Sequence, residues 1–226
     1  MKRFGLFAVA ALVFGLVGAT PSYAGSVNLI TNGTFNTPSP LTPGGWGLYA
    51  NGQISGWSTN DQGGQIEIDT AGAIGPGTNP FSTNSLEVNA NNHETVSQTI
   101  TGLVAGQQYT LTWEYGGRPG SGGTESMNVL LNGSTIATDS SGVVSQLTWT
   151  GNSYTFVAGK GETSVTLSFE GSAPGPGGSD SYGNEVTDVA LYATPEPATW
   201  LLLLSGLGLL GFAMWRKPGL PLSTTI

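Results

Sequence analysis

QQYTLTWEYGG, residues 107–117, is the stretch of sequence that decides the fold. Every second residue in it is large and either aromatic or aliphatic, namely Tyr109, Leu111, Trp113 and Tyr115. Successive side chains of a β-strand point to opposite faces of the sheet, whereas a helix places its apolar residues three and four positions apart. The alternation therefore predicts a strand with one face in an apolar core and one polar face.

Further strands are predicted on both sides of this one, with almost no helix between residues 25 and 193. They are NLITNGTFN (28–36), SLEVNA (85–90), ETVSQTITGL (94–103), SMNVLLNGSTIATD (126–139), QLTWTGNSYTFVAG (146–159), TSVTLSFEG (163–171) and NEVTDVALYA (184–193). Asn132-Gly133 predicts a tight hairpin, because both residues accept the positive φ of a type I′ turn. Short strands joined by Gly-rich turns predict a single all-β domain, an antiparallel β-sandwich of the jelly-roll type.

The composition excludes several classes of function. The chain has 226 residues, no cysteine and only 9 % charged residues, so thiolate nucleophiles, disulfides, zinc fingers and iron–sulfur sites are excluded. Residues 25–194 carry two cations and 13 acids, a net charge of −11. Nucleic acid is excluded as a partner because its binding needs a cationic surface. Divalent cations and neutral polysaccharides remain compatible with this charge.

The first 24 residues predict a secretory signal peptide. Lys2 and Arg3 precede an apolar run over residues 4–17, and a small-x-small cleavage site follows at residues 22–24. The run is short for a membrane anchor and the cleavage site is well formed, which is typical of a cleaved export signal. We therefore expect residues 25–193 to be an exported domain.

Near the C-terminus, residues 198–215 contain no charge. A helix of that length extends about 27 Å at ~1.5 Å per residue, which is enough to cross the hydrocarbon core of a bilayer. The residues predicted to anchor its ends are Trp200, Trp215, Arg216 and Lys217. The sequence therefore predicts one transmembrane helix, with residues 218–226 as a short cytoplasmic tail.

Pro195, Glu196 and Pro197 stand directly before this helix. Tripeptide, helix and basic end together resemble the PEP-CTERM sorting signal of Gram-negative bacteria, over residues 194–217. The resemblance implies that a membrane-embedded exosortase recognises the tripeptide while the protein is held in the inner membrane. It also implies that the tail is then removed and the protein is sent to the cell surface or the extracellular matrix. The basic end departs from the usual Arg-rich cluster, since only two cations are present and nine residues follow them.

The exported domain resembles the galactose-binding-domain-like β-jelly rolls, which include many carbohydrate-binding modules. The resemblance is carried by the opening motif NGTFN (32–36), by SLEVNA and VSQTITGLVAGQQYTLTWEYGG, and by the closing motif Thr187-Asp188-Val189. It implies that the two ends of the domain lie side by side and share a structural calcium ion. The candidate ligands are Asn36, Glu185 and Asp188. Asn36 and Thr187 stand where the family has acids, and Asp188 is alternatively explained as a partner of strand-end amides.

The candidate glycan-binding residues are Trp46, Tyr49, Trp57 and Arg118. Aromatic rings stack on the C–H faces of sugars and neighbouring polar groups bind the hydroxyls, while a guanidinium can bind sugar hydroxyls or a uronate. Structural explanations compete, because large aromatic residues such as Trp57 usually lie in a core and Arg118 can pair with Glu114 or another acid. Two long Gly/Pro-rich loops, residues 70–84 and 171–183, are also predicted to be functional.

No arrangement of residues predicts an enzyme. His93 and Ser97 suggest a hydrolase triad, but the Gly-x-Ser-x-Gly motif is missing from the sequence. Glu67 and Asp69 have a spacing that a glycosidase could use, yet acids at this period are more typical of a solvated strand face. The sequence therefore predicts a non-catalytic surface or matrix protein that binds polysaccharide. The alternatives are a structural or adhesive matrix protein without a glycan site and, less favoured, a secreted hydrolase.

Overall fold

The computed structural model describes residues 27–37, 44–60, 62–89, 94–120, 126–172, 182–194 and 205–212. These residues contain eleven strands and a helical segment at 205–212. The strands are β1 (Trp46–Ala50), β2 (Ser58–Thr59), β3 (Gln65–Thr70), β4 (Asn84–Val88), β5 (Thr95–Thr101), β6 (Gln108–Gly117), β7 (Ser126–Leu131), β8 (Ser134–Ser140), β9 (Thr148–Val157), β10 (Ser164–Gly171) and β11 (Asn184–Ala193).

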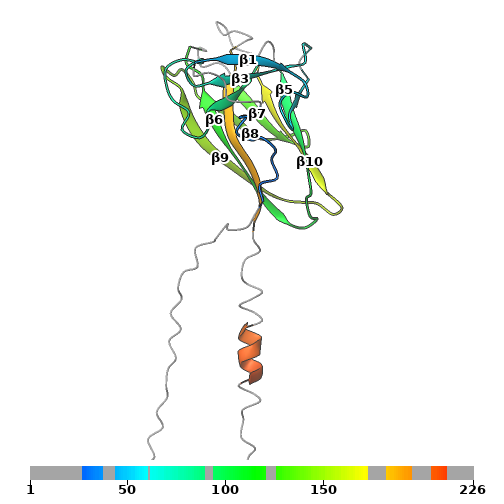
Figure 1. Cartoon of the computed structure of the whole chain (residues 1–226). Helices are drawn as coiled ribbons and strands as arrows, with labels where there is room; N and C mark the ends of the chain where they lie inside the picture. Colours follow the sequence, from blue (N-terminus) through cyan, green and yellow to red (C-terminus); the bar gives the residue numbers. More distant parts are fainter. Residues whose placement is uncertain are drawn as a thin grey trace, which may run out of the picture.

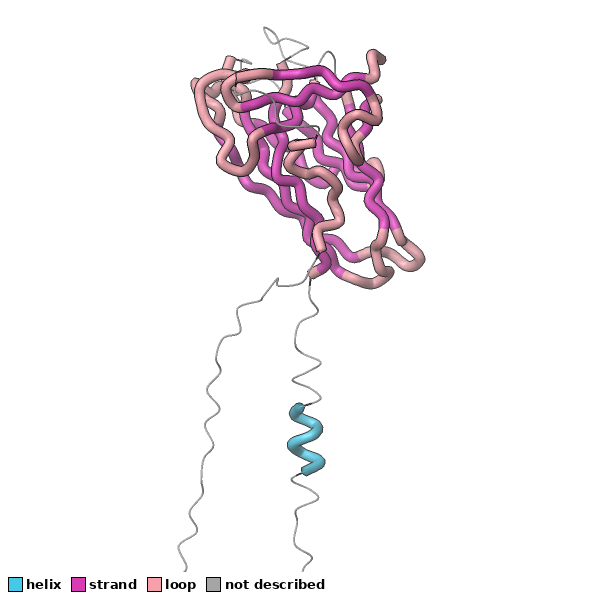
Figure 2. The backbone as a smooth tube through the Cα atoms, in the orientation of Figure 1, coloured by secondary structure: helices cyan, strands magenta, loops and turns pink. Residues whose placement is uncertain are grey.

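The strands form two antiparallel sheets (Figure 1). The larger sheet has the order β1-β3-β4-β11-β6-β9, and the smaller one has the order β2-β5-β10-β7-β8. Figure 2 shows the strands in two layers, with the loops gathered at the ends of the layers. The predicted all-β sandwich is confirmed.

Strand β6 places its apolar face in the core as the alternation predicts. Tyr109, Leu111, Trp113 and Tyr115 are each at most 3 % exposed. They belong to one hydrophobic cluster that also contains Leu167 and Phe169 of β10 in the other sheet. The Trp113 indole donates a 2.8 Å hydrogen bond to Asp139, so the buried N–H group keeps a partner.

The predicted hairpin and the predicted last strand are also confirmed. Asn132 and Gly133 connect β7 to β8 with φ values of 51° and 77° respectively, which are the positive values that a type I′ turn requires. β11 covers residues 184–193 as predicted and lies between β4 and β6.

The opening segment is not the strand that the sequence predicts. Some of its backbone groups bond to side-chain amides instead of to a neighbouring strand. Gln98 of β5 accepts from Thr31 N at 2.8 Å and donates to Thr31 O at 2.9 Å, while the Asn28 amide oxygen accepts from Leu191 N at 2.9 Å. Leu29 N also donates to Leu191 O. The start and end of the domain therefore lie side by side (Figure 1).

Several predicted segments lie outside the described residues. They are the signal peptide at 1–24, His93, residues 173–181 of the predicted 171–183 loop, Pro195, Glu196, Pro197, Trp200, Trp215, Arg216, Lys217 and the tail at 218–226. The predicted membrane helix at 198–215 is described only over 205–212. Across the described ranges, the search for a helix of sufficient length and apolarity to cross a membrane finds none.

Candidate functional site

Three glutamates form a row across the middle of the larger sheet. Glu67 of β3 pairs with Glu87 of β4, and Glu87 pairs with Glu185 of β11. Directly opposed residues share one face of a sheet. Their chain neighbours Ile68 and Val186 lie in the core, so the three carboxylates project from the outer face.

Asp69 lies on the same face two residues beyond Glu67, and we call Glu67, Asp69, Glu87 and Glu185 the carboxylate cluster. Glu87 and Glu185 are 0 % exposed and Asp69 is 1 % exposed, while Glu67 is half-buried. The prediction that Glu67 and Asp69 lie on a solvated strand face is therefore wrong. Neighbouring strands and loops remove these carboxylates from water.

Gly116 occupies the next position of the row of glutamates and leaves space for the Trp149 ring. Gly116 of β6 pairs with Glu185 on one side and with Trp149 of β9 on the other. A Cβ at Gly116 would lie 2.9 Å from both the Trp149 ring and the Glu185 Cβ. Glycine thus allows the Trp149 ring to lie against the strand beside the carboxylate cluster.

Arg118 supplies the positive charge of this site. Its guanidinium forms an ion pair with Glu87 and lies 4.6 Å from the centre of the Tyr182 ring. The Arg118 side chain is 15 % exposed, and Glu87 also accepts a 2.7 Å hydrogen bond from Gly183 N. Arg118 pairs with an acid, as the structural alternative expected, but the acid is Glu87 and the guanidinium is largely covered.

Burial disfavours the charged forms of all four acids. It raises the pKa of Glu67 to about 8, with a further increase from the charge of Asp69 and an opposing effect of Arg118. Burial likewise raises the pKa values of Asp69, Glu87 and Glu185 above their usual range. Among the described residues, the cluster therefore combines four carboxyl groups with one guanidinium in a poorly solvated environment.

The two oxygens of Glu185 and Oδ1 of Asp69 have no hydrogen-bond partner among the described residues. The Ser85 hydroxyl beside Glu185 opposes the rise of its pKa, but the bond that this hydroxyl donates goes to Asp69 O at 3.5 Å. Buried polar atoms without partners are uncommon and costly in native proteins. Glu185 and one oxygen of Asp69 therefore lack hydrogen-bond partners among the described residues, and the cluster holds more negative than positive charge.

These pKa values make stability depend on pH in chelator-treated protein. In the folded chain Glu67 holds its proton up to a pKa of about 8, whereas its ordinary value is 4.5. Between these values the folded state binds more protons than the unfolded state, so stability falls as pH rises. We expect a melting temperature at pH 8 lower than at pH 5 by about 3 °C or more, measured by calorimetry with EDTA. Glu67→Gln is expected to reduce this difference, and an unchanged difference would contradict the assignment.

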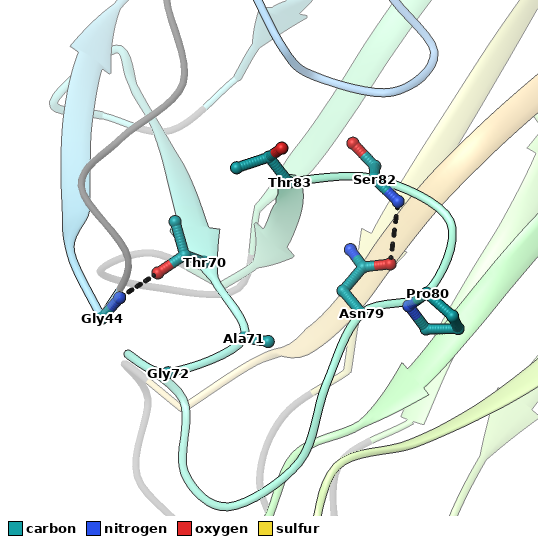
Figure 3. Close-up of a pocket in the computed structure, with 8 residues that line it drawn as sticks. All are labelled: Gly44, Thr70, Ala71, Gly72, Asn79, Pro80, Ser82 and Thr83. Atoms are coloured by element: carbon teal, nitrogen blue, oxygen red, sulfur yellow. Dashed lines mark hydrogen bonds between the residues drawn. The ribbon is translucent and has the colours of Figure 1, made fainter.

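A pocket of about 450 Å³ lies beside the end of β3 (Figure 3). Its lining residues are Gly44, Thr70, Ala71, Gly72, Asn79, Pro80, Ser82 and Thr83. Most of them belong to the 70–84 loop, which the sequence predicts to be functional. Gly44 N donates to the Thr70 hydroxyl at 2.8 Å, and Ser82 N donates to the Asn79 side-chain oxygen at 3.1 Å. The wall is thus built from short polar side chains and exposed backbone.

Exposed aromatic rings stand next to the pocket residues. Trp46 is 60 % exposed and pairs with Asp69, the chain neighbour of Thr70. Phe81 is 40 % exposed and makes an edge contact with the Trp149 ring, with 6.1 Å between the ring centres. The Trp149 indole also donates to Thr78 O at 3.0 Å. Trp149 therefore links the 70–84 loop to the sheet beside the carboxylate cluster.

The other aromatic candidates lie elsewhere. Trp57 is 2 % exposed and occupies the core position that its competing explanation expected. Tyr49 is half-buried and packs against the core. Among the four glycan candidates Trp46 alone offers a largely exposed ring, since Arg118 is held by Glu87.

Asn36, the first candidate calcium ligand, is bonded to protein groups. Its side-chain oxygen lies 3.1 Å from the Ser82 hydroxyl and accepts from Asn84 N at 3.3 Å. The same hydroxyl donates to Thr34 O at 2.7 Å. Ser82 thus joins the oxygens of the opening motif to the pocket loop.

The structure does not gather Asn36, Glu185 and Asp188 at one point. Glu185 belongs to the buried carboxylate cluster, whereas Asp188 is exposed at a β-bulge of β11 with φ of 49°. Burial and the charge of Asp188 raise the pKa of Glu114, which places Asp188 near β6. Calcium binding therefore remains a prediction, and Asn36, Glu185 and Asp188 do not form a single calcium site.

Comparison with known proteins confirms the sorting signal. Residues 193–217 match the PEP-CTERM protein-sorting motif. This motif indicates export, transient membrane anchoring and exosortase processing in a Gram-negative bacterium. A search of curated proteins finds no match to this chain.

Solved structures to which this chain is similar include a cyclase and carbohydrate-binding modules. A cyclase from Fischerella sp. TAU is 18 % identical with a TM-score of 0.52, over 76 % of this chain and 99 % of the cyclase. TmCBM61 in complex with β-1,4-galactotriose is 11 % identical with a TM-score of 0.44, over 74 % and 99 % of the two chains. A family 35 carbohydrate-binding module from Clostridium thermocellum is 10 % identical with a TM-score of 0.38, over 66 % and 98 %.

At such identities the likeness concerns the fold and not the ligand or the reaction. The match that covers most of the chain is to a sequence family. Residues 28–191, which span both sheets and the 70–84 loop, match the family described as "Protein of unknown function (DUF642)". This exported β-sandwich protein therefore belongs to the DUF642 family.

Proposed function

We propose that this DUF642 protein is retained at the cell surface or in the extracellular matrix, where its β-sandwich binds a neutral polysaccharide. The PEP-CTERM motif supports the route of export. The observation that carries the binding proposal is the 60 % exposed ring of Trp46, on the strand that begins two residues after pocket residue Gly44.

The ring and the pocket offer what a sugar needs. An exposed indole leaves apolar surface in water, and stacking against the C–H face of a pyranose covers that surface. Thr70, Asn79 and Ser82 supply hydroxyl and amide groups at the pocket wall, and such groups exchange hydrogen bonds with sugar hydroxyls. Binding requires no charged side chain from the protein.

The charges favour a neutral polymer. The exported region has a net charge of −11, and an anionic polysaccharide would be repelled by it. Arg118, the cation that the sequence offers for a uronate, is engaged with Glu87. A neutral glycan avoids the repulsion and needs no free guanidinium.

The test is retention of the full chain, purified in detergent, on a panel of neutral and acidic polysaccharides. We expect retention on a neutral polymer and a loss of about tenfold in affinity for Trp46→Ala, because one stacked ring contributes about 1.4 kcal/mol. Val143→Ala removes a residue that is 83 % exposed and lies outside the pocket lining, and it serves as the matched control.

The outcomes separate the competing functions. Equal retention of Trp46→Ala and the wild type would remove Trp46 from the site. A protein that no polymer retains would favour a structural or adhesive matrix role. Release of new reducing ends from a polymer would favour the hydrolase alternative.

A further inference from the structure

We infer that the carboxylate cluster of Glu67, Asp69, Glu87 and Glu185 binds one divalent cation, and that Ca²⁺ fits it best. This site differs from the calcium site that the sequence predicts, since Asn36 and Asp188 take no part in it. It also differs from the proposed glycan site, because none of the four acids lines the pocket.

The spacing of the carboxylates suits a calcium ion. One oxygen from each of Glu67, Asp69 and Glu87 lies within 4.8 Å of the others. Oxygens bound to one Ca²⁺ lie at most about 4.8 Å apart, with bonds of about 2.4 Å, so these three oxygens can share one ion. Carboxylate oxygens are hard ligands for both ions, but Mg²⁺ usually keeps several waters, and the burial of Asp69 and Glu87 therefore favours Ca²⁺.

Glu185 gives an independent indication of a ligand. It is 0 % exposed, it pairs directly with Glu87, and both of its carboxylate oxygens are without a hydrogen-bond partner among the described residues. A fully buried carboxylate is stable only with a partner of opposite charge or with a proton. A cation held against Glu67, Asp69 and Glu87 provides such a partner for Glu185.

Arg118 does not remove the need for this cation. Its one positive charge faces four carboxylates, and its ion pair is with Glu87. Each carboxylate oxygen has two lone pairs, so Glu87 can keep Arg118 and Gly183 N and still be a ligand. A divalent ion brings the net charge of the ionised cluster from −3 to about −1.

The position of the ion explains why such a site is useful to an exported protein without disulfides. The three acids whose oxygens lie close together belong to β3 and β4, and Glu185 belongs to β11, which is next to β4 in the larger sheet. The ion therefore joins three strands whose facing glutamates otherwise repel each other. Extracellular modules bind calcium with dissociation constants of about 10⁻⁴–10⁻³ M, and we expect a value in or just below that range.

The experiment uses the full chain in detergent after treatment with chelator. Calorimetric titration with Ca²⁺ is expected to show one ion per chain. At about 100 times the dissociation constant, Ca²⁺ is expected to raise the melting temperature by about 5–10 °C. Mg²⁺ at equal concentration is expected to give a smaller rise. An absence of both binding heat and a thermal shift would overturn the inference.

Variants locate the ion. Glu67→Gln and Glu185→Gln are expected to lose most of the calcium-dependent rise, while without calcium they melt no lower than the wild type. The reason is that a neutral amide removes repulsion and brings no charge into the buried site. Asp188→Asn changes an acid of the same strand outside the cluster and is expected to keep the full rise. If Asp188→Asn loses the rise and the two glutamine variants keep it, the ion binds at the joined ends of the domain instead.

Discussion

Arg118→Met is expected to lower the free energy of unfolding by about 3–5 kcal/mol in chelator-treated protein, because it leaves Glu87 buried without its partner. Glu87 is 0 % exposed and forms its ion pair with Arg118. Methionine keeps much of the apolar stem and removes the charge. The measurement is urea unfolding followed by circular dichroism, at a pH near 8 where the carboxylates are most ionised.

A double variant separates the ion pair from simple packing. Arg118→Met with Glu87→Gln removes both charges, and we expect it to recover most of the loss, since the cost arises from the unpaired buried carboxylate. Lys160→Met removes an exposed cation and is expected to change stability by less than about 0.5 kcal/mol. A loss below about 1 kcal/mol for Arg118→Met, or no recovery in the double variant, would show that the pair is not what stabilises this face.

Much of the fold can be predicted because its main strands carry local signals. The alternation of apolar and polar residues in β6 predicts both the strand and its buried face. Asn132-Gly133 predicts the turn between β7 and β8. The opening segment has the composition of a strand, but the Gln98 side-chain amide binds both backbone groups of Thr31. Strand propensity does not reveal such a partner, which depends on residues far away in the chain.

The carboxylate cluster is harder to predict because strand register creates it. Glu67, Glu87 and Glu185 lie far apart in sequence and meet through pairing of β3, β4 and β11. The sequence around these acids does not reveal their burial. Glu67 stands between two isoleucines and Glu87 between Leu86 and Val88. An acid flanked by apolar residues is the usual pattern of a strand with one solvated face, so the pattern does not show that other parts of the chain cover these carboxylates.

Pattern alone also does not distinguish the two tryptophans of the GGWGLYANGQISGW stretch. Both follow glycine, yet Trp46 is 60 % exposed and Trp57 is 2 % exposed. The difference arises because Trp46 belongs to β1, an edge strand of the larger sheet, whereas Trp57 lies in the core. Only the topology shows which ring is free to contact a ligand.

Trp57→Ala is therefore expected to cost about 3–5 kcal/mol of stability, the usual range for removing a large buried aromatic residue. The Trp57 ring lies 5.2 Å from the Phe35 ring and 5.8 Å from the Phe169 ring. Its indole donates to Asn32 O at 3.2 Å. The substitution opens a cavity between the opening segment and β10, and it removes the donor that holds the turn at Asn32.

The matched comparison is between the two tryptophans under identical urea unfolding. Trp57→Phe is expected to cost less than Trp57→Ala, because a ring remains between Phe35 and Phe169 while the bond to Asn32 is lost. Trp46→Ala is expected to change stability by about 0.5 kcal/mol or less, since little of that ring is buried. A large loss for Trp46→Ala would mean that its ring is part of the structural core. Its effect on polysaccharide retention would then be a consequence of unfolding and not of binding.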